Sequence, residues 1–211
     1  MAASKNLDFD LVKIVTLFEL EESDSCQHLD EWLNARHELD AFEQRIMNDL
    51  YEDVIVSGEY MNEEELKTRM VGLLFYAAQI DVPRKIRVFY ERPLAAVVNG
   101  VSCSVIVDCM VASPVKSSPQ KPYFFLQEFK KAKGEKKDPE AQMLIAMLIA
   151  QAENKDDKPI YGAYMIGTNW HFATLVHKNY CVSKKYEATY KDKLIEIAFA
   201  LRKLKELILN R

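Results

Sequence analysis

The fold is decided by the stretch VVNGVSCSVIVD, residues 97–108, together with YFFLQEFK, residues 123–130. The first stretch predicts two strands joined at Asn99-Gly100, because both central residues of a tight type I′ turn need positive φ. The second stretch is short and aromatic, which predicts a buried third strand that becomes charged only at its end. We therefore expect Asp108 and Glu128 to converge from adjacent strands.

Alternation along these strands gives each charged residue an expected face. Glu128 and Lys130 share one face, and Phe129 points the other way. Asp108 falls on the more polar face of its strand, with Ser102, Ser104, Ile106 and Met110, while the opposite face carries Val101, Cys103, Val105, Val107, Cys109 and Val111. An ionised carboxylate among apolar neighbours is unfavourable unless a metal, a base or an arginine satisfies it. We expect a cleft on the Asp108 side.

The three charged residues have a specific chemistry. Two carboxylates from adjacent strands offer the hard oxygen ligands that Mg²⁺ prefers. Lys130, beside them, could hold an attacking water or offset the charge of a phosphate, so the set suits metal-assisted phosphodiester hydrolysis. The alternative is a plain salt bridge between Lys130 and the two acids.

Asp108, a gap of about twenty positions and Glu-x-Lys at the end of an aromatic strand resemble the PD-(D/E)XK nuclease superfamily. The resemblance covers about residues 60–176, in the order helix, three strands, helix, strand. It implies an α/β fold with a restriction-endonuclease-like core and extra N- and C-terminal helices. It also implies a Mg²⁺- or Mn²⁺-dependent nuclease acting on DNA. Val107 stands where the family's name has proline, a position that varies within the superfamily.

The resemblance assigns roles residue by residue. Asp108 and Glu128 would bind the metal, the main-chain carbonyl of Phe129 would complete the protein's ligands, and Lys130 would serve the attacking water. Gln142, in the first turn of the next helix, resembles a glutamine that many members place beside the active site. The family's helix glutamate would be Glu63, with Glu65 as the alternative, although both also suit simple complementation of a helix dipole.

A lysine-rich segment follows the Glu-x-Lys strand. Lys131, Lys133, Lys136 and Lys137 fall within seven residues, beside the expected metal site. They are candidates for contacts with nucleic-acid phosphates. A solvated turn is the alternative.

Composition limits the class of protein. The chain has 211 residues, 49% of them hydrophobic, and a net charge of −4, so it can form one substantial core. A general nucleic-acid coat protein would be basic, so any DNA contact must come from a local patch. The four cysteines form no CxxC pair and follow no signal peptide, which predicts free thiols in a reducing, cytoplasmic setting. No apolar run approaches a membrane span, and we expect no membrane partner.

The rest of the chain predicts the surrounding elements. Residues 7–20 favour a mostly buried helix, with a strand as the alternative because several are β-branched. Residues 26–51 favour one long helix, and residues 62–80 a helix capped by Asn62. A strand is expected over 86–98, bent or at an edge at Pro93, and a surface loop over 113–122. A helix follows from Asp138-Pro139, then strands at 160–166 and 170–176, and a last helix over 187–209. Residues 1–60 would form a helical extension, 61–180 the nuclease-like core and 181–211 a C-terminal helix, all in one compact unit.

Other functions stay open. Trp32 and Phe42, on the helix over 26–51, suit core packing, but this helix and that over 187–209 could also form a homodimer. The chain could then be a non-catalytic nucleic-acid-binding or assembly module. It could also be a subunit active only with a helicase or targeting partner, which fits the absence of an ATP-binding glycine loop.

Overall fold

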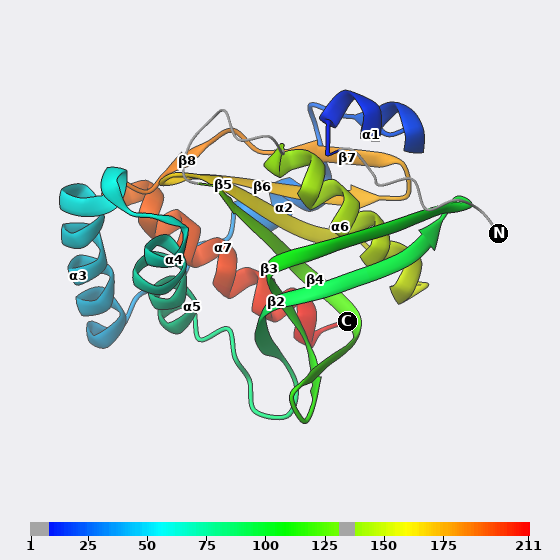
Figure 1. The fold of residues 1–211 in the computed structure, drawn as a ribbon. Coiled ribbons are helices and arrows are strands. Elements are labelled where there is room, and N and C mark those ends of the chain that lie inside the picture. Colours follow the sequence, from blue (N-terminus) through cyan, green and yellow to red (C-terminus); the bar gives the residue numbers. More distant parts are fainter. Residues whose placement is uncertain (1–8, 131–137) are drawn as a thin grey trace.

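The computed structural model describes residues 9–130 and 138–211, and of residues 121–130 only the main chain. The fold is mixed α/β, built on one twisted sheet with helices on both faces (Figure 1). The strand order is β1-β7-β6-β5-β4-β3-β2, and β8 pairs with β6. No helix in the described part of the chain has the length and apolar character to cross a membrane.

The strands of the sheet follow one another as a meander, a crossover and a second meander. β2, β3 and β4 are antiparallel, β4 and β5 are parallel, and β5, β6 and β7 are antiparallel. Helix α6 (Pro139–Asn154) supplies the crossover that a parallel pair requires. The strand bounds are β1 Glu21–Glu22, β2 Arg87–Val98, β3 Val101–Val115, β4 Ser118–Lys130, β5 Ile160–Ile166, β6 Asn169–Val176, β7 Asn179–Val182 and β8 Tyr186–Glu187.

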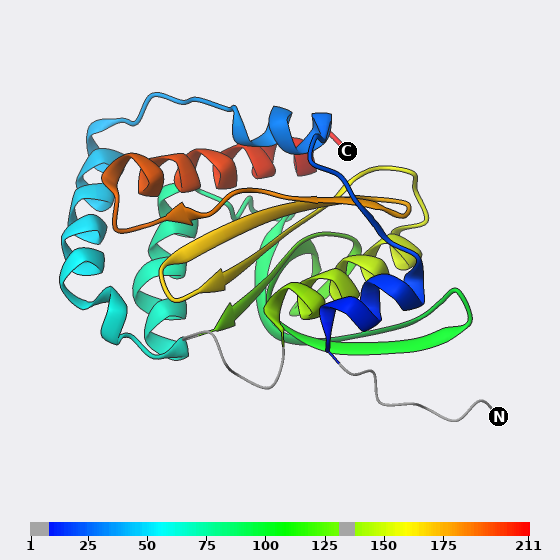
Figure 2. The same cartoon turned by 90° about the horizontal axis from the view of Figure 1, so that it is seen from above.

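Helices form a layer on each face of the sheet. α1 (Leu11–Phe18) and α6 lie on one face, while α2 (Gln27–Leu33), α5 (Gly72–Ala77) and α7 (Lys191–Leu209) lie on the other (Figure 2). α3 (Ala41–Ser57) packs outside α5 and α7. The short helix α4 (Glu63–Glu65) leads through a π-helical segment, η2 (Leu66–Val71), into α5, and a 3₁₀ turn, η1 (Gly58–Tyr60), follows α3.

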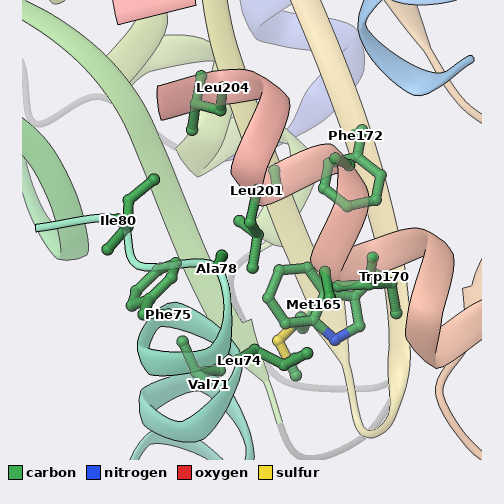
Figure 3. Packing of buried hydrophobic residues seen from close by; sticks show 14 of the residues in the cluster. Val71, Leu74, Phe75, Ala78, Ile80, Met165, Trp170, Phe172, Leu201 and Leu204 are labelled. Atoms are coloured by element: carbon green, nitrogen blue, oxygen red, sulfur yellow. The ribbon is translucent and has the colours of Figure 1, made fainter. Parts of the chain in front are cut away.

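Each face of the sheet has its own hydrophobic cluster. On the α7 face, Leu201 points toward Trp170 and Phe172 of β6, with Leu74 of α5 beside them, and Leu204 belongs to the same cluster one turn further along α7 (Figure 3). Trp32 of α2 is fully buried there, and its indole N–H donates to the Ala200 carbonyl at 2.7 Å. On the α6 face, the helix is buried along most of its length, so its methionines are core residues as their apolar surroundings indicated.

Local turn and cap signals are confirmed. Asn99 and Gly100 have φ of 49° and 80°, as a type I′ turn needs. Asn62 and Asp138 are the N-caps of α4 and α6. Pro93 lies in β2, the terminal strand of the sheet, where a residue without an N–H is tolerated.

The single long helix expected over residues 26–51 is wrong. The chain forms α2 and α3, separated at residues 34–40. Asp40 and Glu43 form a capping box, each side chain accepting from the other's backbone N–H, and this starts a new helix. Trp32 is buried as expected, but Phe42, in the first turn of α3, is 57% exposed.

The surface loop expected over 113–122 is also wrong. β3 continues to Val115 and β4 starts at Ser118, so only a two-residue turn connects them. Pro114 and Pro119 occupy opposite positions in this hairpin. The described pairing of β4 with β5 begins only at Phe125, so this end of β4 has a free edge, where prolines are tolerated.

The expectation of four free thiols needs a correction. Cys26 and Cys181 form a disulfide that joins the start of α2 to β7, whereas Cys103 and Cys109 are free and buried. The two bonded residues are 155 positions apart in sequence. Only the packing of α2 against the sheet brings them together.

Candidate active site

The register of β3 and β4 brings the positions of Asp108 and Glu128 together. Cys109 pairs with Gln127 in this antiparallel ladder, and Asp108 and Glu128 are the next residue on each strand from that pair. Directly paired positions across an antiparallel ladder have Cα atoms about 4.5–5.5 Å apart, and Asp108 and Glu128 lie one residue beyond the last pair of this ladder. On the other side of β4, Glu128 pairs with Tyr164 and Lys130 with Ile166 of β5.

Part of the expected site lies beyond what the structure describes. The main chain of β4 is described through Lys130, but the side chains of Glu128, Phe129 and Lys130 lie outside the described part. The four lysines at positions 131, 133, 136 and 137 lie entirely outside it. Their expected phosphate contacts stay a prediction.

The ladder between β2 and β3 is interrupted at Asp108. Tyr90 pairs with Cys109 and Arg92 with Val107, but Glu91 and Asp108, between them, do not appear as a pair. Glu91 has a φ of 49°, a left-handed conformation that costs a non-glycine residue about 1–2 kcal/mol. Strained backbone of this kind clusters at functional sites.

The faces of β3 change at the same place, which corrects the simple alternation expected from the sequence. Val105 and Val107 pack in the α6 cluster, but Cys109 packs in the α7 cluster, and Met110 returns to the α6 side. Beyond Val107 the expected order of faces is therefore wrong. Asp108, which is half-buried, lies between Val107, the last residue that follows the expected order, and Cys109, the first that departs from it.

A lysine that the sequence analysis missed lies close to this point. Lys67 of η2 has a side chain only 12% exposed, and its Nζ lies 2.5 Å from Glu91 Oε1 and 3.0 Å from Glu64 Oε1. Burial opposes its charged form, but the hydrogen bonds and charges of the two glutamates prevail and raise the pKa of Lys67. The Glu64–Lys67 spacing of three was the available sequence signal.

Lys67 and Asp108 act on a shared neighbour, the Cys109 thiol. Burial raises the pKa of Cys109 most, the charge of Asp108 raises it further, and the charge of Lys67 lowers it. A lysine ammonium and the Asp108 carboxylate therefore share one region of the sheet. The π-helical segment that carries Lys67 is a rare element that often marks functional sites.

The two candidate glutamates of the preceding helix have different surroundings. Glu65 Oε2 accepts from Asn62 N at 2.8 Å, and Asn62 Oδ1 accepts from Glu65 N at 3.0 Å, so Glu65 serves the helix cap. Glu63 is half-buried in the first turn of α4. The capping role accounts for Glu65, and Glu63 stays the candidate site residue.

The start of α6 packs beside the sheet, as expected. Asp138 caps the helix, because its side chain accepts a hydrogen bond from Glu140 N at 2.9 Å. Gln142, in the first turn of the helix, is 6% exposed. α6 packs on β4 and β5.

A further carboxylate, Glu140, adjoins this end of α6. Tyr164, which pairs with Glu128 in the ladder, donates its hydroxyl to Glu140 Oε2 at 2.9 Å and stacks on His171 with ring centroids 4.7 Å apart. Burial raises the pKa of Glu140, while the Tyr164 hydrogen bond lowers it. Sequence reasoning did not single out Glu140, because a glutamate in a first helical turn is ordinary.

The residue types at the site fit a hard divalent cation. Asp108, Glu128 and the Phe129 carbonyl would all supply oxygen, which Mg²⁺ and Mn²⁺ prefer. Among the side chains that the structure describes, no three His, Cys, Asp or Glu residues gather to hold a metal ion, and Glu128 lies outside that set.

No protein-family model matches this chain, and a search of the curated proteins finds no match. Its own residues and their placement are therefore the basis for a function.

Proposed function

We propose that this chain is a metal-dependent nuclease of the PD-(D/E)XK type that hydrolyses phosphodiester bonds in DNA with Mg²⁺ or Mn²⁺. The observation that carries the proposal is the order of elements around Asp108. A helix, the antiparallel strands β2, β3 and β4, the crossover helix α6 and the parallel strand β5 follow one another. Asp108 lies on the middle strand of the meander, and Glu128 and Lys130 end the third.

The residues divide the work in this proposal. Asp108, Glu128 and the Phe129 carbonyl would hold the metal ion, which when bound polarises a phosphoryl oxygen and lowers the pKa of water. Lys130 would orient the attacking water and offset charge on the phosphate. Gln142 and Glu63 would help to position these groups from the two flanking helices.

Lys67 adds a structural role to the proposed site. Its ammonium joins Glu64 of α4 to Glu91 of β2, so it fixes the helix that carries Glu63 against the strand beside Asp108. We regard Lys67 as a positioning residue, because its described partners are protein carboxylates.

An exposed apolar surface favours a second candidate, an assembly role in which the chain associates through α3 and α5. Phe42 and Tyr76 are 57% and 61% exposed and meet edge to face with ring centroids 6.0 Å apart. Aromatic side chains are enriched at protein interfaces. A homodimer, or a complex with a helicase or targeting partner, would use this surface while the proposed nuclease site stays separate.

Cleavage assays test the leading proposal. Plasmid, linear, single-stranded and branched DNA, and RNA, would be incubated with Mg²⁺, Mn²⁺ or EDTA and the wild type, Asp108→Asn or Lys130→Met. Each substitution should lower metal-dependent cleavage by about 100-fold or more, because it removes a proposed metal ligand or the group that serves the attacking water. Asp157→Asn, an exposed aspartate in the loop before β5, is the matched control and should cleave as the wild type does.

The outcomes separate the alternatives. Cleavage that survives in Asp108→Asn would contradict the assigned site. Wild-type protein that binds Mn²⁺ in an Asp108-dependent way but cuts nothing would point to a missing partner subunit. A wild-type protein that neither binds metal nor cleaves nucleic acid would favour the assembly role.

A further inference from the structure

A basic pocket lies at the end of the sheet where β2 begins and β3 turns into β4. Its volume is about 520 Å³, and Arg84, Arg87 and Lys116 line it together with Asp81 and Pro114. Figure 1 shows the loop before β2 and the β3–β4 turn at this end of the sheet. Nothing in the proposed hydrolysis uses these residues.

The three cations of this pocket have no carboxylate partner among the described residues. Asp81 Oδ1 accepts from the Val88 backbone N–H at 2.7 Å and is thereby committed to the main chain. By contrast, Arg69, Arg202 and Arg211 each pair with a carboxylate elsewhere in the described part of the fold. With three cations and the single carboxylate of Asp81 in its lining, the pocket presents a net positive charge.

Two of these cations occupy backbone positions that favour glycine. Arg84 follows Pro83 in the turn closed by the hydrogen bond from Lys85 N to Val82 O at 3.0 Å, and it has a φ of 66°. Lys116 is the first central residue of the hairpin turn between Val115 and Ser118, with a φ of 55°. Glycine is preferred at such positions because side chains are strained by about 1–2 kcal/mol there.

Folding alone does not account for long cationic side chains at these two turns. Both are exposed, and neither makes an ion pair or a side-chain hydrogen bond with another described residue. Lys155 shares this backbone conformation, so what distinguishes Arg84 and Lys116 is that both line one pocket with Arg87, which groups three cations where a ligand could bind. Guanidinium and ammonium groups grouped around one pocket are suited to phosphate.

We infer that this pocket binds backbone phosphates of a nucleic-acid duplex on one side of the cleavage position, an inference that rests on the proposed nuclease function. Ala112, the ladder partner of Arg87, is four residues along β3 from Asp108, and Lys116 is eight. At about 3.3 Å per strand residue these positions lie roughly 13 and 26 Å from Asp108. Phosphates of one DNA strand repeat about every 3.4 Å along the axis, so for a duplex lying along β3 the bound phosphates would fall about four to eight base pairs away.

The test uses substitutions that leave the turns unstrained. In Arg84→Gly/Lys116→Gly both charges are removed but each φ suits glycine, so the thermal midpoint should not fall below that of the wild type. The control is Lys155→Gly. Lys155 is exposed, has a φ of 57° at the C-cap of α6, and does not line the pocket.

Binding would be measured by fluorescence anisotropy in EDTA over a salt series, with a labelled duplex of about 30 base pairs. We expect the double variant to bind about tenfold or more weakly. Its slope of log K against log salt should be shallower by about 1.8, because each phosphate that is no longer neutralised changes the slope by about 0.9. The Lys155→Gly control should match the wild type.

Several results would overturn the inference. One is an unchanged affinity and salt slope for the double variant on the duplex. Another is an equal weakening of binding in Lys155→Gly, which would show that the loss reflects the protein's net charge and not the pocket. Binding to vesicles containing phosphatidylserine with none to DNA would assign the pocket to a membrane surface instead. Because EDTA removes any hydrolysis, the binding result is independent of cleavage. A wild type that cuts nothing but shows the expected binding pattern would leave duplex binding by the pocket standing, without a place relative to a cleavage position.

Discussion

At the scale of single residues, Lys67 is the clearest addition that the structure makes to the candidate site. We expect Lys67→Met to lower the free energy of unfolding by about 1 kcal/mol at neutral pH, since the two glutamate partners are largely solvated and such ion pairs are modest. Urea unfolding of the two proteins measures this difference. Lys67→Arg, which keeps the charge, should lose less.

The pH dependence gives the same interaction a second test. The folded protein raises the pKa of Lys67, so its ion pairs contribute fully below the unfolded-state value of about 10.4 and the contribution is lost as pH rises through the folded-state pKa. The stability difference between wild type and Lys67→Met should be constant from about pH 7 to 9 and shrink only in more alkaline solution. A difference that disappears near neutrality would contradict this role.

At the scale of elements, the disulfide ties α2 to an outer strand of the sheet. Reducing a bond that closes a loop of 155 positions should lower stability by about 2–5 kcal/mol, mainly by releasing the unfolded chain. Thermal melts with and without dithiothreitol measure this, with Cys26→Ser as the control that should no longer respond. An equal response to dithiothreitol in Cys26→Ser would show that another process is being measured.

A close approach of two elements gives another prediction. Gly58, just after α3, lies so near the β5–β6 turn that an added Cβ would stand 2.8 Å from Thr168 Cγ2. Gly58→Ala should therefore destabilise the protein by about 1–3 kcal/mol through overpacking. Thr168→Ser removes the opposing methyl group, so adding it to Gly58→Ala should recover most of the stability in chemical denaturation. If the stability effects of Gly58→Ala and Thr168→Ser simply add, the loss in Gly58→Ala does not come from a clash with the Thr168 methyl group.

At the scale of the whole molecule, one sheet is shared by two hydrophobic clusters. Leu201 of α7 and Leu144 of α6 are each fully buried on opposite faces. Leu201→Ala and Leu144→Ala should each lower stability by about 2–5 kcal/mol while unfolding stays a single transition, because the strands couple both clusters. Circular dichroism and tryptophan fluorescence should give the same midpoint in each variant. Two separated transitions would indicate two independently folding units.

Much of the element order could be read from the sequence because its signals are local. The Asn99-Gly100 turn, the caps at Asn62 and Asp138 and the hairpin of β5 and β6 each depend on residues within a few positions of one another. Those same signals place Asp108 and the Glu-x-Lys segment on consecutive strands. The sequence by itself thus determined which strands carry the candidate residues.

Tertiary structure alone decided how those strands are distorted and what surrounds them. The Lys67–Glu91 ion pair, the Cys26–Cys181 bond and the basic pocket at Arg84 and Lys116 all join segments far apart in the chain. Hydrophobic periodicity reports which side chains are buried but not which remote segment covers them. Such contacts form only when two helical layers close on one sheet, so their geometry is a property of the assembled core.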